Sequence, residues 1–147
     1  MTITSFGGLL TFAEQMETLD MEFYSGAVLA AGMENYADLF SLLVKNTKKN
    51  IAHIQRTRRE NITEMILEPI SGIAEQDFML AELGGQGLTP DRIMGRAVEM
   101  ENRALGFYSA GAEKIKALAE VARALKRAGK TRKANIKALQ EHVQLFE

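Results

Sequence analysis

The sequence lacks cysteine altogether, and this single absence excludes several classes of protein. Without a thiol, the chain cannot form a disulfide scaffold, a cysteine-bound zinc site or iron–sulfur cluster, or a cysteine nucleophile. Proline is almost as scarce, with only Pro69 and Pro90 among 147 residues, so long uninterrupted helices are permitted. Histidine is limited to His53 and His142, which restricts any metal site based on imidazole.

An excess of one charge is also missing. The 18 basic and 19 acidic residues give a net charge of −1, unlike strongly basic nucleic-acid-binding proteins. No apolar run approaches the roughly 18 residues that span a bilayer. A secretion signal needs a Lys or Arg before its apolar stretch, and none precedes the short apolar stretch near residue 10. We therefore expect one domain over residues 1–147, located in the cytoplasm and without a membrane partner.

Apolar residues recur at helical spacing in four long segments. The expected helices cover residues 11–31, 35–67, 90–115 and 118–146. Thr11 and Glu14 form a capping box at the start of the first helix, while Thr89 and Pro90 supply an N-cap and a first helical residue for the third. Gly129 is expected to weaken the fourth helix.

The connection between the second and third helices, residues 68–89, is punctuated by glycines and predicted to be irregular. We expect a short helix near residues 74–83 and no strand. Because the other connections are short, the helices form two hairpins, and the long connection crosses the length of the bundle. The sequence thus predicts an all-α four-helix bundle of two hairpins with a long crossover.

The two hairpins share an internal repeat. The motif E-x-x-D-x-x-F-Y that starts at Glu17 recurs as E-x-x-A-x-x-F-Y starting at Glu101. Further along, T-K-K at 47–49 matches T-R-K at 131–133, and N-I at 50–51 matches N-I at 135–136 after one inserted residue. A repeat that spans a helix and its partner indicates duplicated helical hairpins.

With these motifs the chain resembles the rubrerythrin branch of the ferritin-like superfamily. In that family, a glutamate on the first and third helices and a Glu-x-x-His motif on the second and fourth hold two irons inside the bundle. The resemblance implies candidate metal ligands at Glu17, His53, Glu101 and His142, with Tyr24 and Tyr108 hydrogen-bonded to the carboxylates.

The bridging glutamates of that family are missing here. On the second helix the position falls on Asn50. On the fourth helix it falls on Leu139 if His142 is the histidine, or on Asn135 or Ala134 if the repeat is followed, which puts Ala138 or Lys137 at the histidine position. Asp20, one turn from Glu17, is a further carboxylate that could supply charge. The resemblance then implies at most one residual iron or other divalent metal, or none.

Three functions stay open. The first is a divergent rubrerythrin-like protein without a competent di-iron centre, which acts as a binding or interaction module rather than an enzyme. The second is a di-iron oxidoreductase acting on peroxide or oxygen, which needs an external electron donor because the chain has no cysteine-bound rubredoxin-like domain.

The third function is an anion- or DNA-binding protein that uses the basic runs at residues 45–59 and 123–137, which hold six and seven Lys and Arg residues. The simplest interpretation of both runs is a solvated face, because Lys and Arg rarely leave the surface. Nucleic acid is the less favoured anion because no aromatic residues are interleaved with these charges.

Glu17 and Glu101 lie on helix faces that are expected to turn inward. Without metal, a buried carboxylate must be paired or protonated, so the alternative to metal binding is pairing with His53, a tyrosine or a lysine, with a raised carboxylate pKa. We also expect a homodimer, formed through apolar residues predicted to be exposed. These residues are Phe6, Leu9, Leu10, Phe78, Met79 and Leu80.

Overall fold

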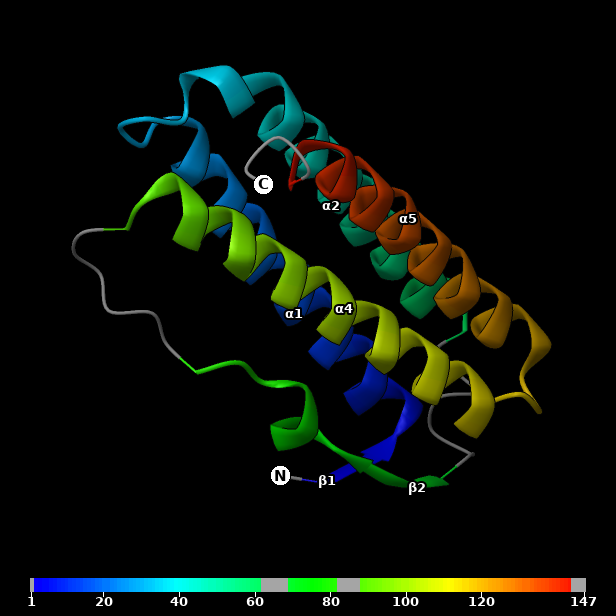
Figure 1. Cartoon of the computed structure of the whole chain (residues 1–147). Coiled ribbons are helices and arrows are strands. Elements are labelled where there is room, and N and C mark those ends of the chain that lie inside the picture. The colour runs from blue at the N-terminus through cyan, green and yellow to red at the C-terminus, as the bar shows by residue number, and fades with distance from the viewer. Residues whose placement is uncertain (1, 62–68, 82–87, 144–147) are drawn as a thin grey trace.

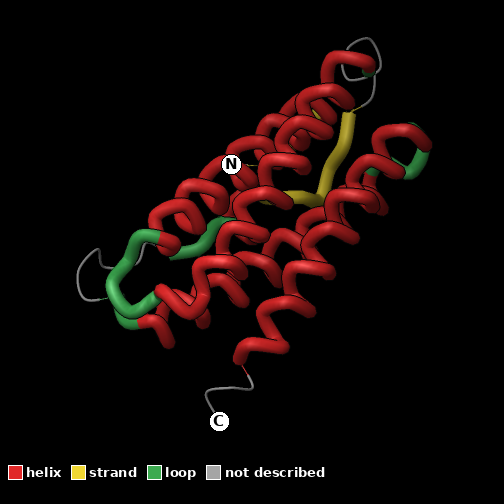
Figure 2. The backbone as a smooth tube through the Cα atoms, turned by 90° about the horizontal axis from the view of Figure 1, so that it is seen from above, coloured by secondary structure: helices red, strands yellow, loops and turns green. Residues whose placement is uncertain are grey.

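The computed structural model describes residues 2–61, 69–81 and 88–143. Four long helices are present in this part: α1 (Phe6–Val28), α2 (Ala37–Glu60), α4 (Pro90–Lys114) and α5 (Ala119–Val143). The remaining elements are strands β1 (Thr2–Ser5) and β2 (Pro69–Ala74) and the 3₁₀ turns η1 (Glu34–Tyr36) and η2 (Glu75–Phe78). Figure 2 shows that helices make up most of the backbone and strands only a small part.

The helices pack as two antiparallel hairpins, α1 with α2 and α4 with α5, which meet through α1–α4 and α2–α5 contacts. Figure 1 shows residues 69–81, which lie between α2 and α4 in the sequence, running along the bundle, with β2 beside β1 near the N-terminus. The predicted all-α four-helix bundle of two hairpins with a long crossover is confirmed. No helix in the described ranges is long and apolar enough to cross a membrane.

The prediction that the chain has no strand is wrong. β1 pairs antiparallel with β2, and Ile3 lies opposite Ile73, both buried against the first turns of the bundle. Each strand has only a few residues, so its alternating pattern is too short to stand out in the sequence. Likewise, the short helix expected at 74–83 is only the turn η2 in the described residues, and 82–83 lie outside them.

The first helix begins earlier than predicted. α1 starts at Phe6, where the Ser5 Oγ accepts a hydrogen bond of 3.0 Å from a first-turn backbone N–H. The expected capping box of Thr11 and Glu14 is therefore wrong, because both residues lie inside the helix. The Glu14 carboxylate instead accepts a hydrogen bond of 2.8 Å from Arg58 of α2 and ties the two helices together.

This early start changes the expected dimer surface. Phe6, Leu9 and Leu10 are 2%, 0% and 0% exposed and belong to the hydrophobic core, so their predicted role in an exposed interface is wrong. Of the other three candidates, only Met79 is largely exposed, at 63%.

The second half of the bundle is closer to the prediction. α4 begins with Thr89 as N-cap and Pro90 as its first residue. α5, in contrast, continues through Gly129 without the expected weakening. Gly129 is buried where α5 meets α4, and a Cβ there would lie 3.4 Å from the Tyr108 Cβ. α2 ends at Glu60, and its expected extension over 62–67 lies outside the described residues.

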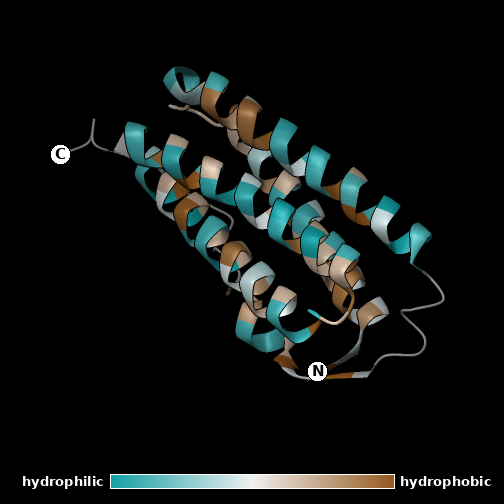
Figure 3. Cartoon of the chain, turned by 90° about the vertical axis from the view of Figure 1, so that its right-hand side faces the viewer, coloured by the Kyte–Doolittle hydropathy of each residue, from teal (hydrophilic) through white to brown (hydrophobic). Residues whose placement is uncertain are grey.

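Two apolar clusters fill the bundle. One includes Phe6, Phe107 and Leu125 near the strands, and the other includes Phe40 and Leu139 toward the opposite end. Figure 3 shows hydrophobic and hydrophilic residues alternating along the helices, as an amphipathic helix requires. Between the two clusters, the interior is polar.

Candidate functional site

A layer of polar side chains crosses the bundle between the two apolar clusters. All four helices contribute to it, and each member is at most 3% exposed. The members are Glu17 and Asp20 of α1, Asn50 of α2, Glu101 of α4, and Arg132 and Asn135 of α5. Polar groups so deeply buried must satisfy one another, which makes this layer the strongest candidate site of the protein.

Arg132 is the centre of the layer and is completely buried. Its Nε donates a hydrogen bond of 3.1 Å to Glu17 Oε2, and its Nη2 lies 3.0 Å from Glu17 Oε1. The same Nη2 donates to Asp20 Oδ2 at 2.8 Å, and Nη1 donates to Glu101. One guanidinium therefore binds three carboxylates from two helices, which its planar set of N–H donors makes possible.

Two asparagines hold the glutamates in equivalent ways. Asn50 Nδ2 donates to Glu17 Oε2 at 3.1 Å, and Asn135 Nδ2 donates to Glu101. Asn135 Oδ1 in turn accepts a hydrogen bond of 2.7 Å from Asn46 of α2. The internal repeat thus extends to the contacts, because each glutamate is bound by the asparagine on the second helix of its own hairpin.

The tyrosines of the repeated motif reach across between hairpins. The Tyr108 hydroxyl of α4 donates a hydrogen bond to Glu17 of α1. The Tyr24 hydroxyl of α1 faces Glu101 of α4 but makes no hydrogen bond of good geometry with any described residue. Both lie beside the carboxylates, as expected, although only Tyr108 forms a clear hydrogen bond.

Asp20 links the layer to the crossover. Its Oδ1 accepts a hydrogen bond of 2.6 Å from Arg103 of α4, whose guanidinium also donates to the backbone oxygen of Phe78 in η2. If all three carboxyl groups are ionised, the cluster has three negative charges against the two of Arg132 and Arg103. One proton on Glu17 or Glu101 makes it neutral.

Burial favours that proton. Loss of solvent raises the pKa of Glu17 and of Glu101 above the ordinary value of 4.5, although the charge of Arg132 opposes the rise. Burial alone would lower the pKa of Arg132, but the charges of Glu17 and Glu101 more than offset this effect and hold that pKa above its ordinary value. Arg132 therefore stays charged, and the variable proton belongs to a carboxyl group.

The histidines do not join the cluster. His53 is half-buried beside Arg127 of α5, and its Nε2 has no hydrogen-bond partner among the described residues. Burial and the charges of Arg127 and Arg56 lower the pKa of His53 below 6.5. The His142 ring packs edge-on against Tyr36, with Nδ1 3.0 Å from its own helix's backbone. Of the four main candidate ligands, only Glu17 and Glu101 are brought together, and the further candidates Asp20 and Asn50 lie in the same layer.

These residues do not fit a di-iron site. Asn50 and Asn135 occupy the positions where the repeat puts the bridging glutamates of the family implied by the resemblance, and both donate hydrogen bonds instead of offering negative charge. The fixed cation Arg132 stands among the carboxylates and repels a second cation. Within the described part of the chain, no group of three His, Cys, Asp or Glu side chains is arranged to hold a metal.

Arg132 is the residue that sequence reasoning missed, because it falls in a basic run interpreted as a solvated face. Arg132 nevertheless lies on the inward face of α5, where buried residues recur every three or four positions. These residues are Val121, Leu125, Ala128, Arg132, Asn135 and Leu139, all buried. When the two halves of the repeat are aligned on Asn50 and Asn135 instead of on the threonines, Arg132 becomes the position equivalent to Thr47.

Comparison of the chain with protein-family models, with curated proteins and with solved structures gave no match. The resemblance to rubrerythrins therefore stays a prediction from the repeated motif.

Proposed function

We propose that this protein is a binding or interaction module on a rubrerythrin-like bundle that has no di-iron centre. In this proposal, Arg132 supplies the positive charge that metals supply in the family the chain resembles. The observation that carries the proposal is the contact of one buried guanidinium with Glu17, Asp20 and Glu101. With that cation present, the carboxylates need no metal for charge compensation.

The same contacts argue against catalysis in the layer. Glu17, Glu101 and Tyr108 are at most 1% exposed and already bind one another or Arg132, so a substrate would have to break those contacts to reach them. The cluster accordingly supports the bundle, and binding takes place on outer surfaces. We further expect a homodimer in the cytoplasm, which light scattering and cell fractionation test.

Metal content tests the proposal. We expect protein from iron-supplemented culture, and protein incubated anaerobically with Fe²⁺ and desalted, to hold far less than two irons per chain. Two irons per chain, lost in the Glu101→Gln variant, would contradict the proposal and favour the di-iron oxidoreductase. A lesser amount of metal that persists in Glu101→Gln would lie outside the buried layer and leave the proposal standing.

A further inference from the structure

A groove between α4 and α5 gathers positive charge that the buried layer does not use. It has a volume of about 450 Å³. Five of its lining side chains are cations, and all five come from α5: Arg123, Lys126, Arg127, Lys130 and Lys133. None of the described residues that line it is acidic.

No ion pair within the described residues neutralises these five charges. None of the five side chains forms an ion pair or hydrogen bond with another side chain there, whereas Arg132, on the same helix, is fully paired. α5 carries no acidic residue between Glu120 and Glu141. Like charges three and four residues apart on a helix repel each other, so a bound anion would relieve this repulsion.

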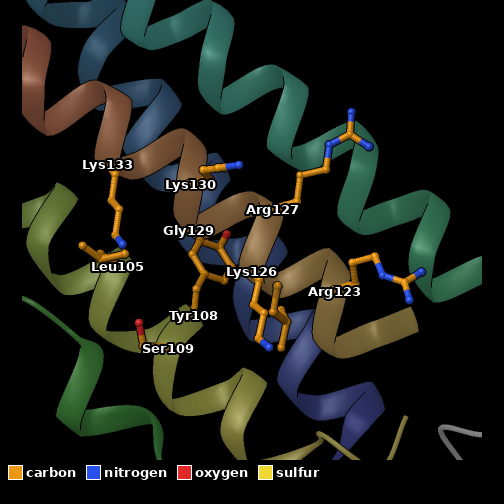
Figure 4. Close-up of a pocket in the computed structure, with 10 residues that line it drawn as sticks. Leu105, Tyr108, Ser109, Arg123, Lys126, Arg127, Gly129, Lys130 and Lys133 are labelled. Atoms are coloured by element: carbon orange, nitrogen blue, oxygen red, sulfur yellow. The ribbon is translucent and has the colours of Figure 1, made fainter. Parts of the chain in front are cut away.

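The floor of the groove is apolar. Half-buried Leu105 of α4 supplies its apolar surface beside Gly129, and Tyr108 and Leu125 lie buried beneath it at 1% and 0% exposed. Figure 4 shows Lys126 and Lys133 extending from α5 toward the α4 side.

Figure 4 also shows Arg123 and Arg127 extending from α5 toward α2, away from the α4 side. Both arginines also line a second hollow, on the α2 side of α5, together with His53 and the acidic residues Glu60 and Glu120. The groove between α4 and α5 therefore combines an apolar patch with cations along its α5 side.

We propose that this groove binds a small phosphorylated organic molecule, with its phosphates on the lysines and its apolar part on the floor. The volume is within the range of about 300–1,000 Å³ typical of small-ligand sites. Lysine binds phosphate as a point charge, and the floor gives an organic ligand an advantage over an inorganic anion. The proposal gives the binding module proposed above a ligand class, and in that sense rests on it.

Isothermal titration with ATP as the probe, at low ionic strength, tests the assignment. We expect Lys126→Gln/Lys133→Gln to weaken ATP binding about tenfold or more, equivalent to losing about 1.4 kcal/mol. The matched control Lys48→Gln/Lys49→Gln removes the same charge from exposed positions of α2 outside the groove and should change binding little. Circular dichroism confirms that each variant is folded.

A second pair of measurements separates the groove from general charge attraction. Ser109→Trp fills the rim at an exposed position without changing the charge, and should weaken ATP binding. Inorganic tripolyphosphate should bind more weakly than ATP and be less affected by Ser109→Trp, because it does not use the floor.

Three results would overturn the proposal: no ATP binding, equal losses in the two double variants, or a short DNA duplex that binds in preference to ATP. The proposed function is tested by the iron content of the wild-type protein, which does not depend on ATP binding. Failure of the ATP experiments is therefore distinguishable from failure of the proposed function.

Discussion

Replacing Arg132 by methionine probes the buried layer most severely. Methionine keeps a long, flexible side chain but removes the charge and every N–H donor. Glu17 and Glu101 then lose their cation, and Asp20 keeps only Arg103. Water cannot replace the lost contacts without entering the core, since the three carboxyl groups are at most 2% exposed.

The expected loss is large on the scale of a small domain. Removing one partner of a buried ion pair costs about 3–5 kcal/mol. A domain of this size has a total stability of about 5–15 kcal/mol, so Arg132→Met should remove a large fraction of it. Arg132→Lys keeps the charge but not the planar set of donors, and should lose about 1–3 kcal/mol, close to the value of one hydrogen bond to a charged group.

Urea unfolding followed by far-UV circular dichroism measures these losses, because the chain has no tryptophan for fluorescence. Lys133→Met is the matched control, because its exposed neighbour position should change stability by less than about 0.5 kcal/mol. Arg132→Met combined with Glu101→Gln should lose less than the sum of the single variants. A loss below about 1 kcal/mol for Arg132→Met, or strict additivity, would refute the buried cluster.

Three further predictions concern single groups. Tyr108→Phe removes the hydrogen bond to Glu17 and should cost about 1.5–3 kcal/mol in urea unfolding, whereas an unchanged midpoint would show that the bond is absent. Ser5→Ala removes the N-cap of α1 and should cost about 1 kcal/mol of stability in the same assay. An unchanged stability would show that Ser5 does not cap the helix and that α1 begins later. The raised pKa values of Glu17 and Glu101 mean that the folded state holds more protons than the unfolded state just above pH 4.5, so their contribution to stability falls as pH rises through that region. The lowered pKa of His53 acts in the opposite direction, because its contribution falls as pH drops below 6.5, and His53→Gln should remove only this second effect from a pH series of unfolding midpoints.

The long-range architecture was predictable because its signals are long. The helical spacing and the repeat extend over many turns, so the four helices, the two hairpins and the inward direction of Glu17 and Glu101 follow from the sequence. The start of α1 was not, because the capping box at Thr11 and Glu14 indicated a later start than the Ser5 N-cap found in the structure. The β1–β2 pair was not predicted either, because each strand is too short to show an alternating pattern.

The site was predicted in part. The two glutamates and their tyrosines were identified, but the partner between the glutamates was expected to be a metal, His53, a tyrosine or a lysine. Arg132 was assigned to the surface with the rest of the basic run at 123–137, and the structure does expose its neighbours Lys130 and Lys133. Composition favours the surface for any arginine, and only the position of Arg132 on the buried stripe of α5 contradicts that tendency.

An arginine, and not a metal, lies between the two repeated glutamates. A crystal structure of the protein soaked in Mn²⁺, with anomalous difference maps, tests this arrangement directly. The arrangement predicts guanidinium density of Arg132 between Glu17 and Glu101 and no anomalous peak there. A manganese peak bridging those two carboxylates, with the Arg132 side chain turned outward, would contradict it.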